Sequence, residues 1–213
     1  MGSKEFASKL APTAAILLAA LLAALLAACG DDPVALPKLS AEAVVLAFGD
    51  SLTYGTGARD YQSYPAVLAK RTRRTVINGG VPGEETHKGL RRLPGLLDKY
   101  QPELLIICHG GNDILRKRDA AATEANLREM IRIGRERNIP VVMIAVPNVG
   151  IFLSSADFYG DIATDLQVPM EEDILAILLG DNNYKSDHVH PNAAGYVRLA
   201  EAMETLLIAH GAL

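Results

Sequence analysis

The sequence predicts an α/β fold in which helices pack on both faces of a mostly parallel sheet. Two observations lead to this prediction. Four short apolar runs are continuous rather than alternating, which is typical of strands buried on both faces of a parallel sheet. Amphipathic stretches separate these runs, and regular alternation of strand and helix favours a parallel sheet between helical layers.

The four expected strands lie at residues 44–48, 75–77, 104–108 and 141–146. Each is rich in valine, isoleucine or leucine, and the polar or glycine-containing segments that follow mark where each strand ends. In an open parallel sheet, ligands bind beyond the carboxyl ends of the strands. The segments that directly follow these four runs are therefore where functional residues are expected.

Three stretches carry apolar residues at helical spacing. Pro94 is expected to kink or split the first helix, because proline lacks the backbone N–H that a helix interior needs. Pro191 is expected at the first position of the last helix, where the missing N–H does no harm. The expected inward faces are Leu90, Leu93, Leu97 and Tyr100; Leu127, Met130, Ile131 and Gly134; and Tyr196, Leu199, Met203, Leu206 and Leu207.

The composition fits a single enzyme-sized domain. A chain of 213 residues, 49% of them hydrophobic, can bury one good core. Its net charge of -4 argues against a nucleic-acid partner, since phosphate binding needs clustered lysine and arginine. The basic run at residues 70–74 is better explained as a solvated helix end. No Cys-x-x-Cys or Cys/His cluster occurs, so a structural zinc site has no support.

Residues 1–28 are expected to be a signal peptide rather than part of the fold. Lys4 and Lys9 precede an apolar run at 14–28 that holds only alanine, leucine and isoleucine. This is the layout of a secretory signal. The run is shorter than the roughly 20 residues that cross a bilayer as a helix. Counted from residue 10 it approaches that length, so length alone leaves an uncleaved anchor open.

The end of this leader, Leu26-Ala27-Ala28-Cys29, resembles a bacterial lipobox. In such signals the cysteine is lipidated and becomes the new N-terminus, and several acyl chains hold a protein stably at a membrane. The alternative is a chance cysteine after an apolar helix. The resemblance implies a lipid-anchored protein of the bacterial cell envelope. The protein would then face the periplasm. In a cell with two membranes, Gly30 after the cysteine favours passage to the outer membrane.

The expected organisation is therefore a lipoprotein signal peptide at 1–28, the lipidated Cys29 with a tether at 29–42, and a folded domain at 43–213. Acidic residues and prolines in the tether are typical of a linker. A disulfide between Cys29 and the second cysteine, Cys108, is not expected. Cys108 falls in an apolar strand, where free cysteine behaves as a small buried hydrophobe.

Polar groups follow three of the expected strands. Ser51 comes just after the first, in a Gly-Asp-Ser-Leu turn from which its hydroxyl can point into a cleft. This turn is not a Gly-x-Ser-x-Gly nucleophile elbow. Gly83 follows the second strand and can offer a backbone N–H to an anion, although the spacing is not that of a phosphate-binding loop. Asn112 follows the third and can donate its side-chain amide. Each motif alone is also typical of an ordinary turn.

Asp187 and His190 lie three residues apart just before the last helix. A carboxylate at this spacing can orient the imidazole, which can then take a proton from a serine. His188 competes for the role of base, and its side chain is expected to point elsewhere if His190 points at the cleft. A metal site built from Asp187, His188 and His190 is the other interpretation. It lacks the helical His spacing of zinc enzymes and an evident further ligand.

Together these motifs resemble the SGNH (GDSL) hydrolase family, in that family's order and over nearly all of the mature chain. The matching segments are 49–52, Gly83 with Asn78, 110–113 and 187–190. The resemblance is closest to the small periplasmic thioesterase, arylesterase and lysophospholipase branch, in which the segment 91–97 is also similar. Glu84 and Glu85 depart from that branch, which usually has Asp-Thr after the glycine.

The resemblance implies a three-layer α/β/α sandwich with a flavodoxin-like sheet. It also implies a serine esterase that needs no cofactor or metal and acts on acyl, aryl or thio esters. Ser51 would attack the ester carbonyl to form an acyl-enzyme, with His190 as base and Asp187 as its partner. The N–H groups of Ser51 and Gly83 and the Asn112 side chain would form the oxyanion hole.

The apolar loop after the fourth strand is expected at the functional edge of the sheet. Ile151, Phe152 and Phe158 are expected to line an acyl groove there, the alternative being that they pack on the core. Two other functions stay open. A carbohydrate O-acetyl esterase would use the same catalytic residues, whereas the intact residue set argues against a non-catalytic envelope lipoprotein. The natural substrate and the oligomeric state are not predicted.

Overall fold

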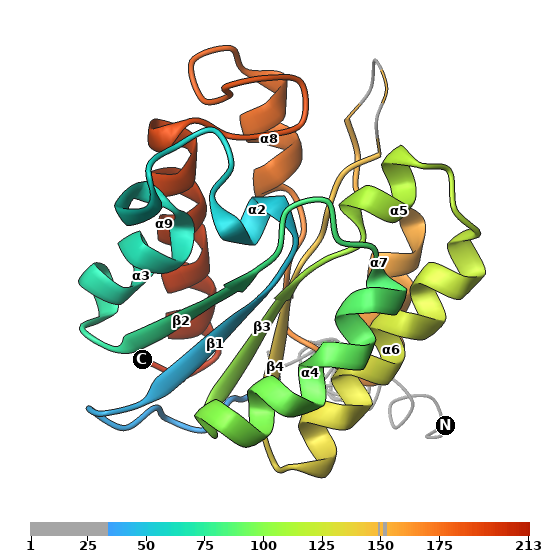
Figure 1. The fold of residues 1–213 in the computed structure, drawn as a ribbon. Helices are drawn as coiled ribbons and strands as arrows, with labels where there is room; N and C mark the ends of the chain where they lie inside the picture. The colour runs from blue at the N-terminus through green and yellow to red at the C-terminus, as the bar shows by residue number, and fades with distance from the viewer. Residues whose placement is uncertain (1–33, 149, 151–152) are drawn as a thin grey trace, which may run out of the picture. The chain divides into compact units, whose positions relative to one another are not determined.

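Five parallel strands form the central sheet in the order β2-β1-β3-β4-β5 (Figure 1). The computed structural model describes residues 34–148, 150 and 153–213, so the expected signal peptide and Cys29 lie outside the described residues. The observed order is the flavodoxin-like one, and the predicted fold class is confirmed. The strands are β1 (Val44–Gly49), β2 (Thr75–Gly80), β3 (Leu104–Cys108), β4 (Val141–Ile144) and β5 (Met170–Glu171).

Helices cover both faces of this sheet (Figure 1). Helices α3 (Tyr64–Thr72) and α9 (Ala193–Ala209) pack together on one face. The opposite face carries α4 (Thr86–Tyr100), α6 (Ala120–Glu136) and α7 (Asp157–Leu166). None of the helices in the described ranges is long and apolar enough to cross a membrane. Shorter elements are α2 (Ser51–Tyr54), the 3-10 turn η1 (Asp60–Gln62), α5 (Gly111–Leu115) and α8 (Ile174–Gly180).

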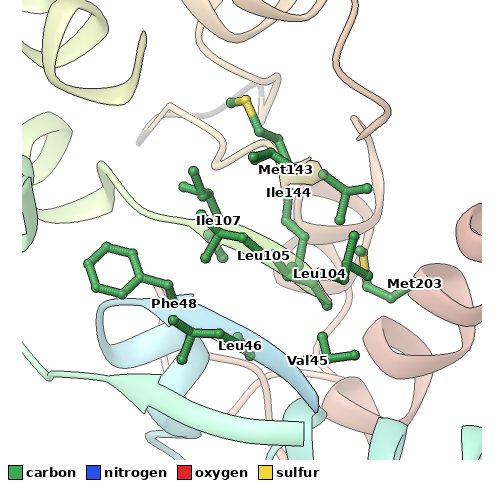
Figure 2. Close-up of a cluster of buried hydrophobic side chains, with 14 of the residues drawn as sticks. Val45, Leu46, Phe48, Leu104, Leu105, Ile107, Met143, Ile144 and Met203 are labelled. Carbon is green, nitrogen blue, oxygen red and sulfur yellow. The ribbon is translucent and has the colours of Figure 1, made fainter. Parts of the chain in front are cut away.

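The core lies where the three middle strands meet the helices. Strands β3 and β4 are buried along their whole length, as their continuous apolar sequences predict. The edge strand β2 is only partly buried, because a neighbour covers just one of its sides. Figure 2 shows the side chains at the centre: Val45, Leu46, Phe48, Leu104, Leu105, Ile107, Met143 and Ile144, with Met203 of α9.

The helix is not split at Pro94, and Pro191 is not at the position expected for it. Helix α4 continues through Pro94, since Leu93 and Leu97 on either side are buried and their packing holds the helix across the missing N–H. Pro191 precedes α9 rather than opening it. Asn192 caps this helix instead, and its side-chain oxygen accepts a hydrogen bond from the Gly195 N–H at 3.0 Å.

The segment before β1 also differs from the tether that was expected up to residue 42. The compact unit begins at Val34, not at residue 43. The Leu36 N–H donates to the His210 carbonyl at 2.8 Å, and the Leu39 N–H donates to the Ala212 carbonyl at 2.9 Å. The Leu39 side chain is only 5% exposed. One buried leucine among polar and proline residues leaves no periodic pattern, which explains why the sequence suggested a linker.

Replacing Leu39 with alanine tests whether this segment is part of the fold. Deleting a buried leucine side chain costs about 2–5 kcal/mol, and we expect the lower end beside a chain terminus. The free energy of unfolding of residues 30–213 would be measured in urea. Val34→Ala is the control, because Val34 is 38% exposed and should change stability by less than about 0.5 kcal/mol. Equal stability of the Leu39→Ala variant and the wild type would show that the segment is a tether after all.

Candidate active site

The carboxyl ends of β1, β2 and β3 lie level with one another. Gly49 at the end of β1 pairs with Gly80 of β2 on one side and with Cys108 of β3 on the other. The segments after these strands therefore start at one edge of the sheet. The chain order reverses beside β1, with β2 on one side and β3 on the other, and ligands of such sheets bind at this reversal.

Ser51 is the first residue of α2 and is separated from the end of β1 by Asp50 alone. The preceding Asp50 caps this short helix, because its carboxylate accepts a hydrogen bond from the Leu52 N–H at 3.0 Å. Gly49 lets the turn approach β3 closely, since a Cβ at this position would overlap the Cys108 carbonyl oxygen. The serine hydroxyl is thus fixed at the end of a central strand.

The structure brings together the three residues expected to form a catalytic triad. His190 Nε2 lies 3.0 Å from Ser51 Oγ, and His190 Nδ1 lies 2.8 Å from Asp187 Oδ2. The other carboxylate oxygen accepts the backbone N–H groups of Val189 and His190 at 2.8 and 2.9 Å. An ionised carboxylate only accepts, so the imidazole proton lies on Nδ1 and Nε2 can accept from the serine.

Asp187 is held in the ionised form that this arrangement needs. Burial raises the pKa of Asp187, but the hydrogen bonds from His190 and from the Val189 N–H outweigh it and bring the pKa below its ordinary value. His188 also lines this cleft, but the hydrogen bond to Ser51 is made by His190. Among residues 34–148, 150 and 153–213, no group of His, Cys, Asp and Glu is arranged to hold a metal ion.

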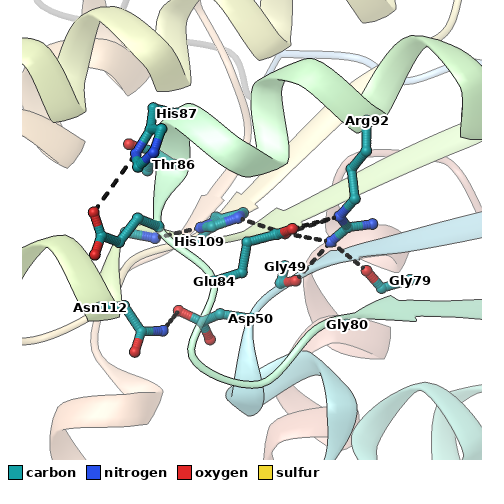
Figure 3. Close-up of polar contacts among 12 residues, drawn as sticks. Gly49, Asp50, Gly79, Gly80, Glu84, Thr86, His87, Arg92, His109 and Asn112 are labelled. Carbon is teal, nitrogen blue, oxygen red and sulfur yellow. Dashed lines mark hydrogen bonds and ion pairs between the residues drawn. The ribbon is translucent and has the colours of Figure 1, made fainter.

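Asn112 reaches the cleft from α5, just after β3, and is 8% exposed. Its side-chain Nδ2 donates to Asp50 Oδ2 at 3.2 Å (Figure 3). An amide nitrogen carries two hydrogens, so one fixes its orientation and the second can serve another acceptor. Asp50 was not among the predicted site residues. Its position beside Ser51 at a strand end is the signal that could have identified it.

Gly83 lies in the turn after β2, with a φ of +75° that only glycine adopts readily. This turn is tied to the serine strand, because the Val81 N–H donates to the Gly49 carbonyl at 3.0 Å. Gly83 does not line the described cleft with Ser51 and Asn112. Its place in the oxyanion hole therefore stays a prediction.

Apart from its polar residues, the cleft is mostly apolar. Pro147 and Leu153 show that the loop after β4 contributes to its wall, as expected. Helices α5 and α8 also contribute, which the sequence analysis missed. The apolar wall consists of Leu52, Ile114, Leu115, Val146, Pro147, Leu153, Leu179 and Val189.

The three residues expected to bind substrate have different outcomes. Ile151 and Phe152 lie outside the described residues. Phe158 packs against the core and is not among the described residues that line the cleft, so its role in substrate binding stays a prediction. Its ring lies 4.5 Å from that of Tyr159, centroid to centroid. Helix α7 begins at Asp157 and turns Phe158 toward the body of the domain.

A buried ionic network lies behind the serine turn (Figure 3). Glu84, whose side chain is 7% exposed, accepts hydrogen bonds from Arg92 Nε at 2.8 Å and from His109 Nε2 at 3.2 Å. Burial raises the pKa of Glu84, but the bonds from His109 and Arg92 outweigh this and lower the pKa to about 2. The glutamate is therefore ionised at neutral pH.

A parallel α/β sheet with a serine at a strand end, hydrogen-bonded to a histidine and through it to an aspartate, has the arrangement of a serine hydrolase, on a scaffold without a nucleophile elbow. The family profile described as GDSL-like lipase/acylhydrolase matches residues 47–198. The chain belongs to this family and is a carboxylic ester hydrolase. The resemblance drawn from the sequence motifs is thereby confirmed.

Characterised relatives agree with this class. The chain is 32% identical to an arylesterase of Vibrio mimicus, over 80% of this chain and 90% of the relative. It is 30% identical to esterase TesA of Pseudomonas aeruginosa, over 79% and 89% of the two chains. The crystal structure of a TesA protein superposes with a TM-score of 0.71 at 27% identity, covering 77% of this chain and 97% of that one. The SGNH-family esterase AlinE4 gives a TM-score of 0.63 at 30% identity, with 80% and 97% covered.

The lowered pKa of Glu84 predicts how acid affects stability. A carboxyl group whose pKa is lower in the folded than in the unfolded state stabilises the fold at any pH above its unfolded-state pKa. This contribution is lost as the pH falls through the folded-state pKa. For Glu84 this window runs from its ordinary 4.5 down to about 2. Unfolding in urea at pH 7, 5 and 3 would compare the wild type with Glu84→Gln. We expect the wild type to be more stable at pH 7 and the difference to shrink by pH 3. A difference that stays constant with pH would contradict this assignment.

Proposed function

We propose that this protein is a lipid-anchored serine esterase that hydrolyses acyl, aryl or thio esters through an acyl-enzyme. The observation that carries this proposal is the chain of hydrogen bonds Asp187–His190–Ser51, with lengths of 2.8 and 3.0 Å, beside an apolar-walled cleft. The names of the relatives support the substrate range: arylesterase, esterase, and thioesterase 1/protease 1/lysophospholipase L1 of Escherichia coli.

In the first half-reaction, Ser51 Oγ attacks the ester carbonyl while His190 Nε2 takes the hydroxyl proton. The tetrahedral intermediate collapses to the acyl-enzyme, and His190 returns the proton to the departing alcohol or thiol. In the second half-reaction, His190 takes a proton from water, the resulting hydroxide equivalent attacks the acyl carbonyl, and Ser51 leaves with that proton. Asp187 stabilises the imidazolium that forms in each half.

The oxyanion would be held by the backbone N–H of Ser51, the second Nδ2 hydrogen of Asn112 and the N–H of Gly83. The bond from Asn112 to Asp50 supports this role, because the amide is already oriented before substrate arrives. Such pre-orientation means that little reorganisation is needed as charge develops on the carbonyl oxygen. Removal of one oxyanion donor typically lowers kcat by about 10²–10³.

The apolar wall would hold the acyl group of the substrate. Ile114 and Leu115 of α5 and Leu179 of α8 provide a surface on which hydrocarbon is removed from water. This favours acyl groups longer than acetyl. A carbohydrate O-acetyl esterase would use the same Ser51, His190 and Asp187 without needing such a wall, so chain-length preference separates the two functions.

Hydrolysis of a p-nitrophenyl ester series from acetate to palmitate tests the proposal. Residues 30–213 should be active, and Ser51→Ala should reduce kcat by about 10⁶, as loss of the nucleophile does in serine hydrolases. Asn112→Ala should leave a measurable rate about 10²–10³ below the wild type. A Ser51→Ala variant that kept a quarter of the activity would refute the serine mechanism.

The same series decides between the alternatives. An optimum at medium or long acyl chains supports the acyl-ester function, whereas an optimum at two carbons favours the O-acetyl esterase. Absence of turnover with any ester, thioester or acetylated glycan would leave a non-catalytic envelope lipoprotein as the better interpretation.

The lipid anchor is proposed from the sequence Leu26-Ala27-Ala28-Cys29, and an anchor at this cysteine would hold the mature protein in the bacterial cell envelope. Expression in bacteria with radioactive palmitate should label the wild type, and Cys29→Ala should abolish the label and move the protein to the soluble fraction. Cys108→Ala is the matched control: Cys108 is buried in β3 and should not affect labelling. Equal labelling of the wild type and Cys29→Ala would overturn the anchor.

A further inference from the structure

The two glutamates that follow Gly83 point to opposite sides of their loop. Glu84 turns inward to Arg92 and His109. Glu85 turns outward, with ion pairs of 2.6 Å to Arg116 and 3.1 Å to Arg118. Both glutamates are largely buried, with 7% and 6% of their surface exposed. The loop that carries Gly83 is therefore held from two sides immediately after the glycine.

Arg92 joins this loop to two strand ends. Its NH2 group donates to the carbonyls of Gly49 at 3.1 Å and Gly79 at 2.9 Å, as well as to Glu84 (Figure 3). The guanidinium also lies over the Phe48 ring, 4.2 Å from its centroid. Gly49 is two residues before Ser51, so one side chain fixes the end of the serine strand, the end of β2 and the Gly83 loop together.

His109 connects the same glutamate to the third strand end. It directly follows β3 and is fully buried. Its Nδ1 accepts from the Gly110 N–H at 2.9 Å, so the ring proton lies on Nε2 and is donated to Glu84 at 3.2 Å. Asn112 follows three residues later in α5. Through Arg92 and His109, Glu84 thus reaches the segments that carry each expected oxyanion donor.

An ion pair buried in this way is a poor source of stability, because desolvation offsets the attraction, whereas it fixes geometry well. Arginine suits the task because its planar fork donates to several acceptors at once, which a lysine ammonium cannot do in the same geometry. The strand-end carbonyls, the ring of Phe48 and the Glu84 carboxylate all use this fork.

We propose that Glu84, through Arg92 and His109, is a positioning residue that sets the Gly83 turn against Ser51 and Asn112 and so assembles the oxyanion hole. The inference rests on the proposed esterase function. The proposal also gives a role to Glu84, where the similar branch usually has aspartate. The longer side chain of glutamate reaches Arg92 and His109 behind the serine turn.

The test uses the full chain in detergent, with Arg92→Lys, Glu84→Ala and Glu84→Gln compared by steady-state kinetics. Misplacement of reacting groups by about 1 Å can cost up to 10²-fold. We expect Arg92→Lys and Glu84→Ala to lower kcat by about 10- to 100-fold with KM within about twofold. Glu84→Gln should recover part of the loss, since its amide oxygen still accepts from Arg92. The matched control is Arg137→Lys, whose wild-type arginine pairs with the exposed Asp98 at 3.0 Å, and it should match the wild type.

A second readout separates positioning from loss of folded protein. The rate constant of covalent inactivation by a p-nitrophenyl alkylphosphonate, which develops charge on a phosphoryl oxygen, should fall in parallel with kcat. Near-UV circular dichroism would establish that the variants are folded. If the Arg92→Lys variant does not fold, the kinetics of Glu84→Gln test the proposal, because this substitution preserves the volume of the side chain and most of its hydrogen bonds.

Folded variants with wild-type kcat and inactivation rate would overturn the positioning role. So would a loss of activity that matches the fraction of unfolded protein. These results differ from failure of the esterase function itself, in which the wild type would be no more active than Ser51→Ala, and the positioning proposal would fall with it.

Discussion

The parallel pairing of β1 with β2 on one side and β3 on the other is the constraint on which the site depends. Because Gly49 is level with both Gly80 and Cys108, three chain segments leave the sheet at the same height. One carries the serine, one carries Gly83 and one carries Asn112. A slip in either pairing would shift an entire donor group by a residue spacing of roughly 3.3 Å along the strand, enough to misplace a hydrogen bond.

Contacts between residues far apart in the sequence then complete the site that the strand register begins to assemble. The bond between His190 and Ser51 joins residues 139 positions apart. Asp187, in contrast, reaches its histidine within one turn, and its backbone bonds pre-form that turn. Asp187 and His190 thus form a local structure, and the packing of α9 on the domain brings this structure next to Ser51. The Tyr196 hydroxyl, which donates to the Thr56 carbonyl at 2.8 Å, ties that helix to the segment after Ser51.

The sequence predicted much of this arrangement because the relevant signals are local. Buried strands leave continuous apolar runs, and Ser51, Asn112, Asp187 and His190 stand in short motifs beside strand or helix ends. The ionic network could not be predicted, since the partners of Arg92 lie on β1, on β2 and in the loop after β2, and their pairing exists only after folding. Leu39 and the two-residue β5 were missed for a similar reason: a single contact or a very short pairing produces no periodic pattern.

The start of the described chain lies at one end of α9 and the site at the other. The His210 ring bonds to the Val34 carbonyl at 2.7 Å, just beyond the last residue of α9, whereas His190 stands just before its first. A helix of 17 residues is about 25 Å long. The first described residue, Val34, and the catalytic His190 therefore lie at opposite ends of α9. The cleft at Ser51 is accordingly lined by later segments of the chain and by none of residues 34–39.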